Sequence, residues 1–377
     1  MAETYMLEPD LGFIKEVAKL GGGDLKRCYQ CATCSVACPI SPETKPFPRK
    51  EMIAASWGLK DRLVADHDIW LCHNCGDCTM LCPRGAKPGD VMAALRAYAV
   101  AEYAAPKIVA TAVNDPKKLP VLLAIPAAII IVLGLITGFI DFSPEGIEVV
   151  QGHFISSWLV DMIMIPTFFW GVAVFALGLK RFLNDIHKAA VASGKTDTEK
   201  IDPLGMGKAF IRTIPIILAH KRFNECSENK SRATAHLMVL YAFIALFIVT
   251  NIFFFALYIL GQPGPYSQLN PVKWLANIGG VSLVVGSLLL IKQRIEKTGQ
   301  ISAYKDWVLL GLALGLGLTG LGTEIARLAG WAFVSYFVYF IHLMLIFALF
   351  AYTPFSKLAH IAYRTVAMTY ETYINRS

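Results

Sequence analysis

The sequence predicts an all-α protein in which a helical, cysteine-rich domain precedes a bundle of six membrane-spanning helices. Eight of the nine cysteines lie between residues 28 and 82, and long apolar segments occupy most of the chain after residue 118. No stretch of useful length alternates apolar and polar residues as a half-buried strand does. We therefore expect a domain at 1–118, a membrane domain at 119–360 and a tail at 361–377.

The cysteines form two copies of the pattern Cys-x2-Cys-x2-Cys-x3-Cys-Pro. This spacing is typical of paired [4Fe–4S] clusters, in which the fourth cysteine of each run binds the cluster of the other run. Zinc usually takes paired Cys-x2-Cys units, and disulfide scaffolds are short secreted chains, so both alternatives fit less well. The pattern predicts electron transfer with two ligand sets: Cys28, Cys31, Cys34 and Cys82 for cluster 1, and Cys72, Cys75, Cys78 and Cys38 for cluster 2.

The amino-terminal domain is expected to hold these clusters in loops between helices, as a helical two-cluster ferredoxin domain. A proline-rich loop at 39–48 leads into a helical stretch that carries Met52, Ile53, Leu59 and Leu63. A second helix, rich in alanine, is predicted at 91–103.

Composition indicates a membrane protein: 55% of the residues are hydrophobic and the net charge is +7. Basic chains can bind nucleic acid, but here the excess bases lie in loops between apolar segments, where lipid topology explains them better. Residues 1–20 lack the features of a signal peptide. We expect the cysteines to lie in the reducing cytoplasm, where disulfides are rare.

Each of six apolar segments is close to the ~20 residues that a helix needs to cross a bilayer. Lysine and arginine gather before the first segment, at 180–234 and at 292–305, whereas 141–153 and 261–271 carry none. The positive-inside rule then places both termini and the cysteine domain on the cytoplasmic side of the inner membrane. The predicted spans are 119–140, 154–179, 235–260, 274–291, 307–328 and 331–353.

The long inner loop contains an apolar segment with scattered bases, Met206 to Phe223. It could lie flat on the membrane surface or pack against a partner, and the sequence does not decide between them. The lone Cys226 in this loop is expected to be inert. The histidines on the soluble side are expected to be surface or cluster-flanking residues: His67, His73, His187 and His220.

Four histidines lie in or beside the spans, where two histidines on facing helices commonly hold haem b. His236 opens the third span at its inner end, level with His360, so these two form the first candidate pair. His342 and His360 are 18 residues apart, about 27 Å along one continuous helix, although Pro354 between them favours a kink. His342 and His153 form the second candidate pair; His153 could instead face water or line a quinone pocket.

Ionisable side chains within spans are functional candidates because burying them in lipid is costly. Asp161, Glu324 and Arg327 could supply protons and hydrogen bonds to a quinone. Glu324 and Arg327 are one helical turn apart, so a structural ion pair is an equally good reading of these two residues.

The cysteine runs, Cys28-Tyr-Gln-Cys31-Ala-Thr-Cys34 and Cys72-His-Asn-Cys75-Gly-Asp-Cys78 with their fourth cysteines, resemble the C subunit of heterodisulfide reductase. The spans resemble that enzyme's haem b membrane subunit and the gamma subunit of respiratory nitrate reductase. The nitrate reductase resemblance implies two haem-ligating histidines on each of two helices, and His342, His360 and His236 match three of them. Leu246 stands near the fourth position and cannot bind iron, so an outer haem requires His153 as a replacement.

The fused order of the two halves resembles the C subunit of the quinone-interacting membrane-bound oxidoreductases of sulfate-reducing microbes. That resemblance implies menaquinone as the membrane partner. It also implies soluble flavin and iron–sulfur subunits resembling heterodisulfide reductase A, and electron exchange with adenylylsulfate reductase in sulfate respiration. The chain carries no Cys-Cys-Gly motif, and no Gly-x-Gly-x-x-Gly fingerprint follows a predicted strand, so we expect it to bind neither flavin nor nicotinamide.

Two other functions stay open from the sequence. The chain could anchor a soluble heterodisulfide-reductase-like complex and relay electrons without quinone chemistry of its own. It could also couple electron transfer to ion pumping, although its intramembrane polar residues are scattered rather than connected across the spans.

Overall fold

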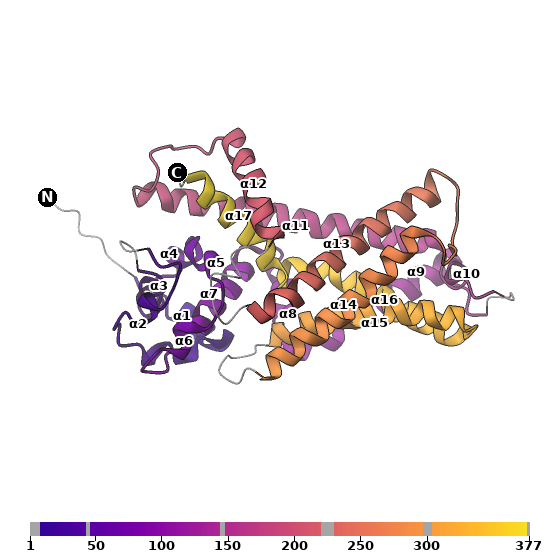
Figure 1. Ribbon diagram of the computed structural model, residues 1–377, viewed down its shortest axis with the longest axis horizontal. Coiled ribbons are helices and arrows are strands. Elements are labelled where there is room, and N and C mark those ends of the chain that lie inside the picture. Colours follow the sequence, from indigo (N-terminus) through magenta and orange to yellow (C-terminus); the bar gives the residue numbers. More distant parts are fainter. Residues whose placement is uncertain (1–7, 43–45, 144–147, 220–229, 297–303, 375–377) are drawn as a thin grey trace.

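The computed structural model describes residues 8–42, 46–143, 148–219, 230–296 and 304–374. Throughout these ranges the regular elements are helices, with one isolated bridge between Ile140 and Ile155. The predicted all-α class is confirmed. Figure 1 shows short helices gathered at one end of the molecule and long helices running side by side toward the other end.

The amino-terminal domain packs short helices around α7, whose proline at its first position is compatible with a helix start. The helix predicted at 91–103 is confirmed as part of α7, whereas the predicted helical stretch from Met52 to Leu63 is two helices. They separate at Gly58, which has φ of 69° and whose added Cβ would lie 2.9 Å from the backbone nitrogen of Asp10. The helices are α1 (Leu11–Val17), α2 (Thr33–Val36), α3 (Arg49–Ser56), α4 (Lys60–Val64), α5 (Asp68–Leu71), α6 (Asp77–Met80), α7 (Pro88–Tyr103) and α8 (Lys107–Val113).

Within the described ranges, six helices are long and apolar enough to cross a membrane. They begin and end within a few residues of the predicted spans, with one exception. Helix α11 has 36 residues and continues to Ala192, well past the predicted end at 179. The helices are α9 (Leu119–Thr137), α11 (Ser157–Ala192), α13 (Lys230–Tyr258), α14 (Pro271–Glu296), α15 (Tyr304–Leu328) and α16 (Ala332–Tyr352), with the short α10 (Gln151–Phe154) between the first two.

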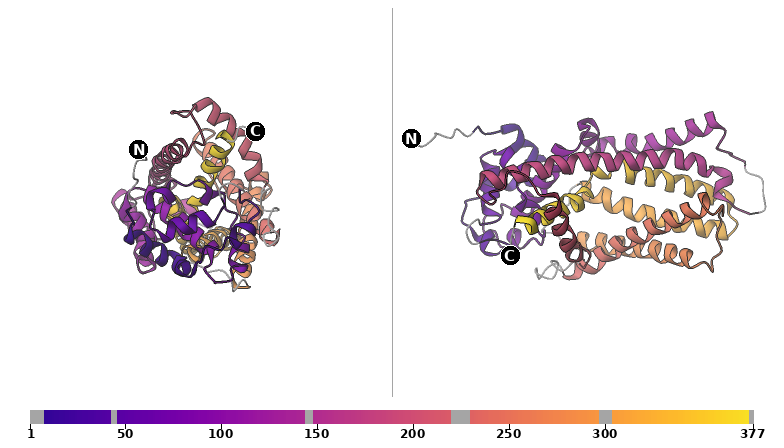
Figure 2. Two further views of the ribbon diagram at one scale, coloured as in Figure 1. Left: turned by 90° about the vertical axis from the view of Figure 1, so that its left-hand side faces the viewer. Right: turned by 90° about the horizontal axis from the view of Figure 1, so that it is seen from above.

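The extension of α11 follows from its packing. Phe182 and Ile186 on this extension are fully buried in the same apolar core as the amino-terminal domain, so protein rather than lipid covers them. Figure 2 shows α11 leaving the bundle of spans and running alongside the amino-terminal domain.

The chain does not continue as one helix after the last span. Helix α16 ends at Tyr352, a short turn spans Thr353–Phe355, and α17 (Ala359–Ile374) follows. A proline within a helix loses a backbone hydrogen bond, which explains the break beside Pro354. His342 and His360 therefore lie on different helices, and the single-helix spacing between them does not apply.

Helix α17 occupies most of the predicted tail and packs against α5, α7, α11 and α12 (Pro203–Leu218). An aromatic group holds it: the rings of Trp70 and Tyr363 stack with centroids 5.1 Å apart, and Phe182 meets both edge-on. Gly178 on α11 permits this approach, because an added Cβ would lie 2.6 Å from the Tyr363 hydroxyl. Helix α17 thereby joins the amino-terminal domain to the spans.

Candidate functional site

The first cysteine group lines one cavity in the amino-terminal domain. Its members are Cys28, Cys31, Cys34 and Cys82. Gln30 and Ala32 have positive φ angles of 60° and 68°, so the loop curls around the cavity before α2 begins. Cys31 is exposed, and the hydroxyl of Thr33 lowers the pKa of its thiol.

The second cysteine group lines a separate cavity. Its members are Cys38, Cys72, Cys75 and Cys78. Asn74 and Gly76 supply the positive φ angles of this loop, 52° and 94°, and the backbone nitrogen of Asn74 donates to Cys72 Sγ at 3.4 Å. The structure therefore gathers the eight cysteines in the same two groups that the spacing predicts for the clusters.

The chemistry of both groups suits a cationic iron centre. Burial, together with the charges of neighbouring cysteine thiolates, raises the pKa of Cys34 to about 11 and of Cys38 to about 12. Thiolates that repel one another in a shared cavity are stabilised when a cation lies between them. The eight cysteines of the two cavities form no disulfides with one another.

Two arginines hold the loop that carries Cys72. Arg364 Nη1 on α17 donates to the Cys72 carbonyl at 2.7 Å. Arg96 on α7 donates to the carbonyl of Ile69 and to Asn74 Oδ1, both at 3.0 Å. Sequence reasoning missed both arginines because no local pattern marks a contact between residues so far apart in the chain.

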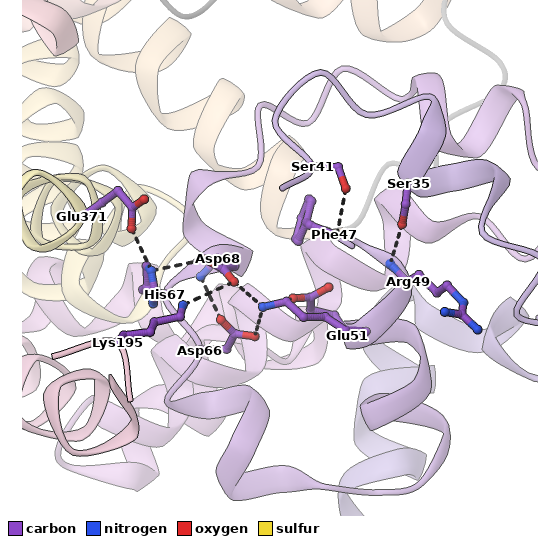
Figure 3. Close-up of polar contacts among 11 residues, drawn as sticks. Ser35, Ser41, Phe47, Arg49, Glu51, Asp66, His67, Asp68, Lys195 and Glu371 are labelled. Atoms are coloured by element: carbon purple, nitrogen blue, oxygen red, sulfur yellow. Dashed lines mark hydrogen bonds and ion pairs between the residues drawn. The ribbon is translucent and has the colours of Figure 1, made fainter. Parts of the chain in front are cut away.

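A largely buried polar cluster joins the same domain to α17 and, through Lys195, to the segment that follows α11 (Figure 3). His67 Nε2 lies 2.9 Å from Glu371 and 3.2 Å from Asp68, and Lys50 contacts Asp68 and lies 3.0 Å from Glu51. The surface reading of His67 is wrong, since its side chain is buried, and His187 is likewise buried.

His73 lines the second cysteine cavity, as a cluster-flanking residue would. His220 and Cys226 lie outside the described residues.

His360 is the second residue of α17 and lies one turn before Arg364. Its Nδ1 bonds to the Lys357 carbonyl, which can only accept, so Nδ1 carries the proton and Nε2 keeps its lone pair. Burial lowers the pKa of His360 to about 3, and the charge of His236 on α13 acts in the same direction. His360 is thus neutral, as a metal-binding imidazole must be, and His236 lies in its neighbourhood.

His342 lies on α16 against α15. Thr319 Oγ1 donates to the Gly315 carbonyl at 2.6 Å and lies 2.8 Å from His342 Nδ1. Because the hydroxyl proton is already used, Nδ1 donates to Thr319 and Nε2 again keeps its lone pair. Gly320 makes room for the ring, since an added Cβ would lie 3.2 Å from His342 Cε1.

His153 is exposed on α10. Helix α10 contacts α16 through Gln151 Nε2, which donates to Ser335 Oγ at 3.1 Å, about two turns before His342, and through Phe154, whose ring stacks on Tyr336. Leu246, at the place of the missing family ligand, packs against Gly279 of α14.

The intramembrane charges separate into two sites. Asp161 on α11 accepts a hydrogen bond from the Tyr258 hydroxyl at the end of α13. Glu324 instead lies 2.8 Å from Arg327 and 3.0 Å from Lys273, and also binds Gln268. Lys273 and Tyr258 were not singled out from the sequence, because their partners lie on other helices.

Comparisons with known proteins define the class of the amino-terminal part. A family model described as a 4Fe-4S dicluster domain matches residues 24–86, which include all eight cysteines. This part of the chain is therefore an iron–sulfur electron-transfer domain.

The relatives belong to heterodisulfide reductases. The chain is 36% identical over 83 residues to the C subunit of the H2:CoB-CoM heterodisulfide,ferredoxin reductase of Methanothermobacter marburgensis, and this match covers 22% of the chain and 45% of that protein. It is 34% identical over 105 residues to a protein of Archaeoglobus profundus that is named as being like the C subunit of heterodisulfide reductase, with 28% and 56% covered. No solved structure matches.

The chain spans about half the length of the curated relatives it matches. It therefore combines an iron–sulfur domain similar to the C subunit of heterodisulfide reductases with a multi-pass membrane region.

Proposed function

We propose that this chain is the membrane redox subunit that exchanges electrons between the menaquinone pool and soluble flavin and iron–sulfur subunits. The soluble subunits would resemble heterodisulfide reductase A, and adenylylsulfate reductase would be the further partner in sulfate respiration. The complex would be a quinone-dependent oxidoreductase, with the amino-terminal domain and both termini on the cytoplasmic side. Two [4Fe–4S] clusters and haem b would supply one-electron chemistry, which the side chains alone lack.

The observation that carries this proposal is the contact between the two halves. The Cys72 loop is bound by Arg364, and His360 lies one turn earlier on the same helix. A single helix therefore touches one cysteine cavity and presents a neutral imidazole at the end of the spans that lies beside the amino-terminal domain. An anchor without redox groups in the membrane would not need that imidazole.

The proposed ligands follow from the geometry of the side chains. Cluster 1 would be held by Cys28, Cys31, Cys34 and Cys82, and cluster 2 by Cys72, Cys75, Cys78 and Cys38, because each set lines one cavity. His236 and His360 would hold the inner haem. His342, with its Nε2 lone pair fixed by Thr319, is a candidate ligand of a second haem.

For the quinone we favour Asp161 over Glu324. Asp161 accepts a hydrogen bond from the Tyr258 hydroxyl, and a carboxyl–phenol pair can exchange protons with a quinone oxygen. Glu324 is bound by two cations and an amide, as a structural ion pair would be.

The test is an anaerobic titration of the detergent-purified chain with a menaquinol analogue, following the haem b absorbance bands. Reduction of the bands is expected, and the same haem signal should be lost in His236→Ala and in His360→Ala. Haem that stays oxidised in the presence of quinol would favour the anchor and relay function. Folded protein with intact clusters but without haem would overturn the assignment of the histidines.

A further inference from the structure

Helix α12 lies in the long loop between α11 and α13 and packs one face against α17. Ala209 and Thr213 on this face are buried, and Thr213 Oγ1 lies 3.2 Å from Thr372 Oγ1. The helix start is fixed as well, because Asp202 caps the backbone nitrogens of Leu204 and Gly205. Helix α12 is therefore an attached element of the fold, with one side committed to protein.

The opposite face of α12 is apolar and uncovered. Leu204, Ile211 and Leu218 recur every seven residues, which places them on one side of the helix. Their side chains are 68%, 69% and 37% exposed. Covering a large aliphatic side chain removes apolar surface from water and is favourable, so a row of three favours a state in which an apolar surface lies against it.

The position of α12 indicates what covers this row. Figure 1 shows α12 running across the direction of the spans, at the end of the bundle that carries the amino-terminal domain. Its last residue is tied to a span, because the Tyr241 hydroxyl of α13 donates to the Leu218 carbonyl at 3.1 Å. On α13, Ile244 and Ile248 beside Tyr241 are also exposed, as lipid-facing residues of a span are. The apolar row of α12 is thus continuous with a surface that faces lipid.

The charges on α12 also indicate that lipid covers the apolar row. Lys208 and Arg212 are exposed on one edge of the apolar row, and the helix carries no acidic residue from Pro203 to Leu218. Helices with an apolar face and basic flanks lie in the plane of the membrane interface, where the bases meet anionic headgroups.

We propose that α12 is an interfacial membrane helix, with Leu204, Ile211 and Leu218 in the acyl region and Lys208 and Arg212 against anionic lipid headgroups. The other face of α12 packs against α17, and Arg364 of α17 binds the Cys72 loop. An α12 held at the membrane surface therefore sets the distance of α17 and of the Cys72 loop from the bilayer. The proposal does not depend on which cofactors the protein holds.

The test measures where the Ile211 side chain lies. The full chain with Cys226→Ser and Ile211→Cys is labelled anaerobically with a nitroxide and placed in nanodiscs of equal parts phosphatidylcholine and phosphatidylglycerol. The accessibility of the nitroxide to oxygen, which concentrates in lipid, is compared with its accessibility to a water-soluble nickel chelate. Leu204→Cys gives a second position on the apolar row, and Asp197→Cys, in the exposed loop before α12, is the matched aqueous control. The Cys226→Ser chain without an added cysteine gives the background.

We expect labels at 211 and 204 to favour oxygen over nickel, and the label at 197 to show the inverse ratio. A nickel-accessible label at 211 and 204 would overturn the proposal, because the row would then face water. Protection from both reagents would also overturn it, because protein would then cover the row. The pair Lys208→Gln and Arg212→Gln should lower the oxygen ratio at 211 in phosphatidylglycerol discs, with little change in pure phosphatidylcholine. An equal effect in both lipids would contradict the headgroup contact.

Discussion

Arg364 Nη1 donates a hydrogen bond of 2.7 Å to the backbone carbonyl of Cys72, across 292 positions of sequence. The donor is a cation, the acceptor belongs to a cysteine of the second cavity, and the two lie on opposite sides of the junction between the halves. This bond connects the iron–sulfur domain to the helix that follows the last span.

Replacing Arg364 with Gln should loosen that junction. Loss of a hydrogen bond made by a charged group costs roughly 1.5–3 kcal/mol of stability, and removal of the positive charge should lower the reduction potential of cluster 2. Anaerobic potentiometry followed by electron paramagnetic resonance measures both cluster signals. Arg84→Gln is the matched control, since Arg84 lies over Tyr29 beside the first cavity, 4.0 Å from the ring centroid. A larger shift of cluster 1 than of cluster 2 in Arg364→Gln would contradict this assignment.

Glu51 should make the stability of the protein depend on pH. It is 1% exposed, and burial raises its pKa from 4.5 to about 9. Between these values the folded state holds a proton that the unfolded state has released, so stability falls as pH rises, by up to ~1.4 kcal/mol per pH unit. Glu51→Gln keeps the shape and removes the titration. The thermal midpoint of the purified variant should therefore change less between pH 6 and pH 9 than that of the unmodified protein.

The matched control for Glu51 is Glu102→Gln. Burial acts on Glu102 too, but Lys107 and Lys60 lower its pKa below the usual range. The Glu102 carboxyl is ionised in both the folded and the unfolded protein throughout the neutral range. Its replacement should therefore leave the change of the thermal midpoint with pH as it is in the unmodified protein. If the thermal midpoint of Glu51→Gln changed with pH as much as that of the unmodified protein, Glu51 would be ionised in the folded protein.

The sequence was sufficient where the signal is local. The cysteine spacing predicts both groups that line the cavities, and the length of the apolar segments predicts six membrane helices. Contacts between distant parts of the chain could not be predicted from the sequence. Neither the extension of α11 around Phe182 nor the packing of α17 through Tyr363 follows from the hydropathy of these segments. The partners of His67 and His342 were missed for the same reason, because Glu371 and Thr319 become neighbours only when helices pack.

Cys38→Ser tests the exchange of the fourth cysteines between the two runs. Cys38 is the last cysteine of the first run in sequence but lines the second cavity with Cys72, Cys75 and Cys78. A serine oxygen is a poorer ligand for iron than a thiolate, so the spectrum of cluster 2 should change more than that of cluster 1. Cys82→Ser is the reciprocal variant and should perturb cluster 1. If each variant instead altered the cluster of its own run, the ligand sets would not be exchanged.

Thr319 should control how well His342 can act as a haem ligand. Its hydroxyl holds His342 Nδ1 at 2.8 Å, so Nε2 is the atom that would bind the proposed haem. Loss of such a supporting hydrogen bond typically lowers metal affinity about 10–100-fold. Thr319→Val keeps the volume and removes the hydroxyl, so haem content per chain should fall and the redox potential of the haem proposed at His342 should shift. Thr319→Ser retains the hydroxyl and should restore the wild-type spectrum. A normal spectrum in Thr319→Val would show that the orientation of His342 is set by packing against Gly320, or that His342 holds no haem.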